Sequence, residues 1–192
     1  MKKLFSLTTV MLIATTTAAL AHHPLGGEVP DSVWHGFLSG VGHPVIGFDH
    51  FVFVVVIGVL AAMQQARYNM PIGFIAGTIA GTLLSISLVT LPFAEWIITL
   101  SIVLAGAVAM RGRETMTMPA TALAALAGIF HGWAYGEAVI GAEMTPLIAY
   151  LTGFSFIQVV IVLGTGYVVR TIWRASSADA LPPRLTGALV AG

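Results

Sequence analysis

The sequence predicts an all-α fold: a polytopic bundle of about five to six transmembrane helices after a cleavable signal peptide. Of its 192 residues, 57% are hydrophobic and only 8% are charged, and the mean hydropathy is +0.94. Soluble domains carry about 25% charged residues, so this chain lacks the polar surface that water requires. Several long apolar segments approach the ~20 residues that a spanning helix needs.

The first residues have the pattern of a secretory signal peptide. Lys2 and Lys3 form a positive start, residues 4–14 are apolar, and Ala19-Leu20-Ala21 matches the small-x-small cleavage rule. Cleavage after Ala21 leaves a single transmembrane helical domain over residues 22–192; the alternative is an uncleaved signal anchor.

Five spans are expected after the signal. They cover residues 47–66, 71–91, 93–110, 119–138 and 146–173. A proline suits the first turn of a helix, where the N–H group that it lacks would have no partner in the helix. Three of the expected spans begin at or near such a residue: Pro71, Pro119 and Pro146. Residues 32–42 are too short to cross alone and predict a short or re-entrant helix, whereas residues 185–192 resemble the start of a sixth span.

The arginines predict the orientation. Basic residues favour the cytoplasmic side, and with an outside N-terminus all six arginines of the mature chain fall there: Arg67, Arg111, Arg113, Arg170, Arg174 and Arg184. The predicted location is therefore the bacterial inner membrane, with several passes and the mature N-terminus outside.

Most acids fall on the opposite side. Glu28, Asp31, Glu95, Glu137 and Glu143 lie at or near the predicted outer face, and Glu114 and Asp179 lie inside. An approaching cation would meet an attractive field there. The alternative is that only the basic residues are distributed unequally between the two sides of the membrane. The acids would then predominate outside without forming a site.

Glycines repeat every four residues along two spans. Gly73, Gly77 and Gly81 form such a stripe on the second span, and Gly128, Gly132 and Gly136 form another on the fourth. Small residues at this spacing let two helices approach closely, which predicts packing faces. Trp96, Trp133 and Trp173 near span ends indicate interface anchors.

The first group of ionisable residues is His43-Pro44-Val45-Ile46-Gly47-Phe48-Asp49-His50. Ionisable side chains within a membrane are costly and point to function. Two imidazoles and a carboxylate suit a divalent ion such as nickel, cobalt or zinc. The chain has no cysteine, which excludes thiolate sites. A continuous helix would return His43 to nearly the face of His50, although the Pro44–Gly47 turn could break that register.

The second group lies near the outer end of the fourth span. His131 and Tyr135 are one helical turn apart, and Glu137 follows Gly136. The predicted topology puts both groups at the same membrane level. A single buried histidine is more often a satisfied structural side chain, but four buried ionisable residues in two converging groups favour a metal site.

Three further histidines are candidate ligands. Cleavage would give His22 a free α-amine beside His23, an arrangement that can chelate a metal, although exposed terminal histidines are often idle. His35, on the short helix, could face the same cavity as the two groups of ionisable residues, or it could face the solvent.

The stretch from His43 to His50 resembles the HPxxGxDH signature of the HupE/UreJ family of hydrogenase and urease accessory membrane proteins. The stretch from His131 to Glu137 is similar to that family's second motif, and the resemblance extends over the whole chain. It implies a nickel or cobalt permease with His43, Asp49, His50, His131 and Glu137 as metal-site residues. Two features depart from the family pattern: Tyr135 stands where many members carry a second histidine, and the last helix is shorter.

The predicted mechanism is facilitated uptake, with the ion as transported substrate and no permanently bound cofactor. The outer acids would collect the ion, the histidines and Asp49 would hold it, and Thr78, Thr82, Ser85, Ser87 and Gln158 would line the onward path. Because ligands must be unprotonated, uptake should fail as the pH falls toward about 6.5. The predicted partners are the lipid bilayer and a divalent transition-metal ion, with a homo-oligomer left open and no nucleic acid.

Three alternatives follow from the same residues. The chain could be a non-transporting accessory protein that delivers nickel or cobalt to enzyme maturation, or a haem protein with paired histidine ligands. An intramembrane hydrolase ranks last, because the sequence has no HExxH or GxSxG motif. We therefore expect no enzymatic activity.

Overall fold

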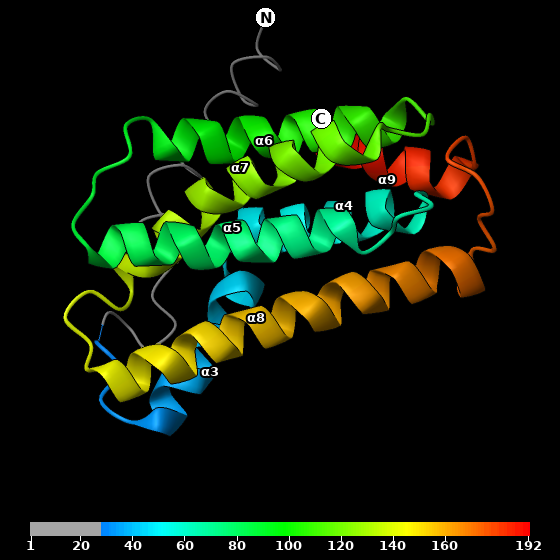
Figure 1. Cartoon of the computed structure of the whole chain (residues 1–192). Coiled ribbons are helices and arrows are strands. Elements are labelled where there is room, and N and C mark those ends of the chain that lie inside the picture. The colour runs from blue at the N-terminus through cyan, green and yellow to red at the C-terminus, as the bar shows by residue number, and fades with distance from the viewer. Residues whose placement is uncertain (1–27) are drawn as a thin grey trace, which may run out of the picture.

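The computed structural model describes residues 28–192, which fold entirely into helices and connections (Figure 1). The α-helices are α3 (Val33–Ile46), α4 (Phe48–Ala62), α5 (Asn69–Ile86), α6 (Ala94–Met110), α7 (Thr117–Glu137), α8 (Met144–Tyr167) and α9 (Leu181–Ala191). A π-helical turn, η1 (Val168–Ile172), continues α8. The predicted signal peptide, His22 and His23 lie outside the described residues.

The outside of the bundle is apolar, as expected of a membrane protein. Large side chains such as Phe48, Trp96, Leu123 and Leu163 are more than half exposed. Two helices of the described part are long and apolar enough to cross a bilayer, namely α5 and α8 with η1. The bent pair α3 and α4 can count as a third span, and α6 is a shorter apolar helix. The all-helical fold of the described residues is thus confirmed, with two or three candidate membrane spans, and the number of five to six spans stays a prediction.

A sharp break separates α3 from α4. The two helices are bent by 79° relative to each other, at Gly47, whose backbone is extended (φ −69°, ψ 100°). Pro44 is tolerated inside α3, and the Gly47 N–H donates to the His43 carbonyl oxygen at 3.0 Å. The helical register does not continue from His43 to His50, so the bend itself brings these side chains together.

The glycine stripes of α5 and α7 form the closest helix contact. A Cβ atom added at Gly77 or Gly132 would collide with the backbone of the other helix, at Ala125 and Thr78 respectively. The Thr82 hydroxyl crosses the same interface and donates to the Gly132 carbonyl oxygen at 2.8 Å. The predicted packing faces are therefore confirmed, and they hold α7 and its functional residues rigidly beside α5.

The connections are divided between the two ends of the bundle (Figure 1). Those joining α4 to α5, α6 to α7, and η1 to α9 lie at one end; those joining α5 to α6 and α7 to α8 lie at the other. All six arginines of residues 28–192 belong to the first end: Arg67, Arg111, Arg113, Arg170, Arg174 and Arg184. We call it the arginine end.

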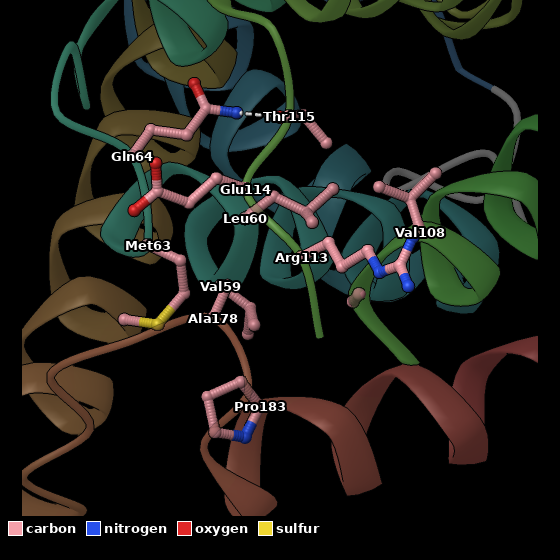
Figure 2. Close-up of a pocket in the computed structure, with 11 residues that line it drawn as sticks. Val59, Leu60, Met63, Gln64, Val108, Arg113, Glu114, Thr115, Ala178 and Pro183 are labelled. Carbon is pink, nitrogen blue, oxygen red and sulfur yellow. Dashed lines mark hydrogen bonds between the residues drawn. The ribbon is translucent and has the colours of Figure 1, made fainter. Parts of the chain in front are cut away.

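A hydrogen bond ties two connections together at the arginine end. Figure 2 shows Gln64, which follows α4, reaching Thr115 of the α6–α7 connection. The Gln64 Nε2 atom donates to the Thr115 hydroxyl at 2.5 Å, and Gln64 is buried. Arg113 and Glu114 border the same small pocket (Figure 2). The α6–α7 connection therefore packs against the end of α4.

Candidate metal centre

Two histidines from different helices are in direct contact. The Nδ1 atoms of His50, in the first turn of α4, and His131, near the end of α7, lie 2.9 Å apart. The other ring nitrogen of His131, Nε2, lies 3.0 Å from the Ser101 hydroxyl of α6. Both histidines are fully buried, and Phe53 stacks on the His131 ring at 4.4 Å. The predicted convergence of the two motifs is observed.

The third histidine is anchored by a tyrosine. The Nδ1 atom of His43 lies 2.8 Å from the Tyr150 hydroxyl of α8, and that hydroxyl donates to the Tyr135 carbonyl oxygen at 2.7 Å. His43 is 1% exposed and Tyr150 is fully buried. The His43 and His50 ring centres are 5.8 Å apart, so the bend at Gly47 places both motif histidines in one buried cluster.

Tyr135 occupies the centre of this cluster. Its ring centre lies 4.9 Å from that of His43 and 4.7 Å from that of His50. Its hydroxyl accepts a hydrogen bond from the Gln158 Nε2 atom at 3.3 Å, and the Gln158 Oε1 atom accepts one from Thr78 at 3.2 Å. Two of the expected path residues thus connect to the histidine cluster through Tyr135.

Asp49 lies beside His50 at the N-terminus of α4. Its Oδ1 atom accepts the His50 backbone N–H at 2.9 Å and lies 4.0 Å from the His50 Nε2 atom. Zinc binds nitrogen and oxygen at about 2.0–2.2 Å in a tetrahedral arrangement, which puts two of its ligands roughly 3.4 Å apart. The carboxylate and the imidazole are therefore close neighbours, and they would have to approach each other further to share a single ion.

The two remaining candidates of the described residues, His35 and Glu137, have exposed side chains. His35 is exposed, and its Nδ1 atom lies within hydrogen-bonding distance, 2.7 Å, of the Asp31 Oδ1 atom. Glu137 ends α7 with an exposed side chain. Within residues 28–192, no three His, Asp or Glu side chains already form a metal-binding group. The rings of His43 and His50 instead flank Tyr135.

The candidate path residues are also divided. Thr78, Thr82, Ser85 and Gln158 are buried, whereas Ser87 is exposed and donates to the Leu83 carbonyl oxygen of its own helix. Thr78 of α5 contacts Gln158 of α8, whereas Thr82 and Ser85 pack against Gly132 and Gly136 of α7.

A cavity of about 580 Å³ opens between α4, α6 and α7. Its walls are mainly apolar, with Phe53, Leu104 and Leu123 among them, and charged side chains line only its arginine end. A divalent ion needs nitrogen or oxygen ligands, so these walls do not suit one. Ser101 stands in the wall, between this cavity and His131.

Sequence reasoning did not identify Ser101 and Tyr150. Neither residue belongs to a motif, and both read as ordinary members of apolar spans. Their importance appears only when α6 and α8 are packed against the histidines. No pattern in one sequence could have selected them.

Comparison with known proteins identifies the family of this chain. The family model described as HupE / UreJ protein matches residues 10–192. The chain belongs to the HupE/UreJ family. The curated protein named Protein HupE, from Rhizobium leguminosarum bv. viciae, is 28% identical over 182 residues, covering 93% of each chain. No solved structure matches this chain.

Proposed function

We propose that this HupE/UreJ protein is an inner-membrane permease that takes up divalent nickel or cobalt. The observation that carries the proposal is the buried cluster of His43, His50 and His131, brought together from three helices of a membrane protein. Burying three imidazoles in an apolar bundle is costly, and in membranes such residues mark ion pathways. Imidazole and carboxylate are ligands that nickel and cobalt accept.

The distribution of charge supports an inward direction of transport. The histidine cluster lies toward the end opposite the arginines, where Glu95 and Glu143 begin α6 and α8. With the arginine end in the cytoplasm, a cation from outside meets carboxylates first and guanidinium groups last. His22 and His23 would add to the collecting surface, and Glu137 stands at the same end.

The onward path would follow the polar contacts between α5, α7 and α8. From Tyr135 the hydrogen bonds run to Gln158 and on to Thr78. Buried polar groups in this line can replace part of the ion's hydration shell as it moves. At the arginine end, the hydrogen bond between Gln64 and Thr115 joins the end of α4 to the α6–α7 connection, and we expect the ion to leave near this contact.

Uptake of labelled nickel and cobalt tests the proposal in cells that lack their own importers. The intact protein is compared with Asp49→Ala and His50→Ala, and the membrane abundance of each is measured. Asp179→Ala is a matched control, because this exposed acid lies at the arginine end. We expect uptake by the intact protein and the control, and loss in both site variants.

If the intact protein is abundant in the membrane and moves neither metal, the permease proposal fails. The alternative function, delivery of nickel or cobalt to metalloenzyme maturation without transport, then becomes the better explanation. Support for metal handling of either kind comes from the family, whose members are hydrogenase and urease accessory proteins.

A further inference from the structure

The hydroxyl of Ser101 fixes the proton positions of two histidines. Its oxygen lies 2.7 Å from the Ile98 carbonyl oxygen and 3.0 Å from the His131 Nε2 atom. The hydroxyl donates its proton to the shorter of these contacts, the Ile98 carbonyl oxygen, which can only accept. Ser101 has only that proton. With that proton directed to Ile98, the Ser101 oxygen accepts a hydrogen bond from His131 Nε2–H.

The consequence passes from His131 to His50. A neutral imidazole carries one N–H, so His131 with its proton on Nε2 has a lone pair on Nδ1. The His50 Nδ1 atom lies 2.9 Å from that lone pair and must be the donor. His50 therefore has its proton on Nδ1 and its lone pair on Nε2, the atom that lies 4.0 Å from the Asp49 carboxylate.

Tyr150 has the same effect on His43. The Tyr150 hydroxyl donates its proton in a hydrogen bond to the Tyr135 carbonyl oxygen at 2.7 Å. The contact of 2.8 Å with His43 is then a hydrogen bond donated by His43 Nδ1–H. His43 thus has its lone pair on Nε2 as well. Two separate hydroxyl groups, on α6 and α8, thus impose the same tautomer on His43 and His50.

We propose that Ser101, His131 and Tyr150 are positioning residues. They fix the tautomers of His43 and His50, so that each of these two rings directs its Nε2 lone pair to the ion that the family motif is expected to bind. This assignment rests on the proposed function and deepens it. Both nitrogens of His131 are engaged by neighbours, so this histidine orients His50 and does not bind the ion. Metal-binding histidines commonly donate their second N–H to such a partner, which fixes the ring and makes it a better ligand.

Nitrogen-15 NMR on histidine-labelled full-length protein in lipid nanodiscs tests the tautomers without metal. Single His→Gln variants assign the signals. We expect protonated Nδ1 on His43 and His50 and protonated Nε2 on His131. If Ser101 instead donates to His131, the order reverses and His50 carries its proton on Nε2; that result overturns the assignment.

Cobalt binding supplies the second test. X-ray absorption of the Co²⁺-loaded protein should count two imidazole ligands, and three would restore His131 as a ligand and overturn the inference. Loss of a positioning partner typically costs 10–100-fold in metal affinity, so Ser101→Ala should weaken Co²⁺ binding about that much. Ser101→Thr keeps the hydroxyl and should restore binding. Thr99→Ala is the control, because the exposed Thr99 hydroxyl bonds only within its own helix.

The outcomes separate this inference from the proposed function. A protein that transports cobalt but shows three bound imidazoles, or the reversed tautomers, overturns the ligand assignment alone. A protein with the expected tautomers that neither binds nor moves Co²⁺ or Ni²⁺ overturns the proposed function, and the inference with it.

Discussion

The Nδ1 atoms of His50 and His131 lie 2.9 Å apart although 81 residues separate them in the chain. The contact joins the first turn of α4 to the last turns of α7, and it depends on two features of the backbone. One is the break at Gly47, which sets the start of α4. The other is the glycine interface that holds α7 against α5.

We expect Gly47→Ala to disturb the site directly. A Cβ atom at this position would lie 2.7 Å from the Cδ2 atom of His50 and 3.2 Å from the His43 carbonyl oxygen. The ring must move, so metal uptake should fall strongly while the protein still reaches the membrane. Gly164→Ala is the control, because an added Cβ there meets nothing within 4 Å. Equal uptake by both variants would show that the close approach at Gly47 has no role.

Gly132→Ala should destabilise the helix bundle. The added methyl group would overlap the Thr78 backbone of α5, and overpacking of this kind costs about 1–3 kcal/mol in the free energy of unfolding. Thermal unfolding in detergent measures the change. Gly166→Ala, with open space around its Cβ, should unfold at nearly the wild-type temperature. A Gly132 variant as stable as this control would contradict the tight interface.

The sequence predicted the helical membrane fold, the glycine interface and the meeting of the two motifs. Those features depend on composition and short-range spacing, which a single chain contains. The 79° bend was foreseen only as an option, because Pro44 and Gly47 allow a turn without fixing its angle. The partners Ser101 and Tyr150 were missed, since their function depends on the packing of distant helices.

The ends of the helices could also not be predicted fully from the sequence. The second span was expected to continue to residue 91, but α5 ends at Ile86. Leu88 and Phe93 adopt left-handed backbone conformations, each with φ 59°, and Pro92 between them cannot continue a regular helix. Hydropathy gives the apolar length of a segment, and the helix within that length ends where the backbone turns.

The orientation can be tested with introduced cysteines. The natural chain has none, so each single substitution reports one position. A membrane-impermeant thiol reagent should label Glu143→Cys in intact cells and leave Arg113→Cys unlabelled until the membrane is opened, because basic connections face the cytoplasm. Both residues are exposed, which makes access the same in either case. The reverse pattern of labelling would invert the proposed direction of transport.

Tyr135→His should strengthen metal binding. The Tyr135 ring centre lies within 5 Å of those of His43 and His50, so an imidazole there adds a nitrogen ligand between them. We expect the number of imidazoles seen by X-ray absorption of bound Co²⁺ to rise from two to three and the affinity for Co²⁺ and Ni²⁺ to increase. Tyr135→Phe is the matched control that removes the hydroxyl without adding a ligand. Unchanged affinity in Tyr135→His would mean that this ring does not face the ion.

Tyr150→Phe separates the positioning of His43 from the packing of α8. Phenylalanine fills the same space but offers no acceptor to His43 Nδ1–H, so the His43 ring loses its fixed tautomer. The affinity for Co²⁺ should fall about 10–100-fold.

The same change also removes the hydrogen bond to the Tyr135 carbonyl oxygen, which should lower the free energy of unfolding by about 0.5–1.5 kcal/mol. Both quantities are measured, by calorimetric titration with Co²⁺ and by thermal unfolding, with Tyr167→Phe as the control on the exposed side of α8. A variant that loses stability but keeps its affinity would make Tyr150 a packing residue only. A variant that loses affinity far beyond its loss of stability is the result that positioning requires, because a folded site with a misdirected imidazole cannot present Nε2 to the ion.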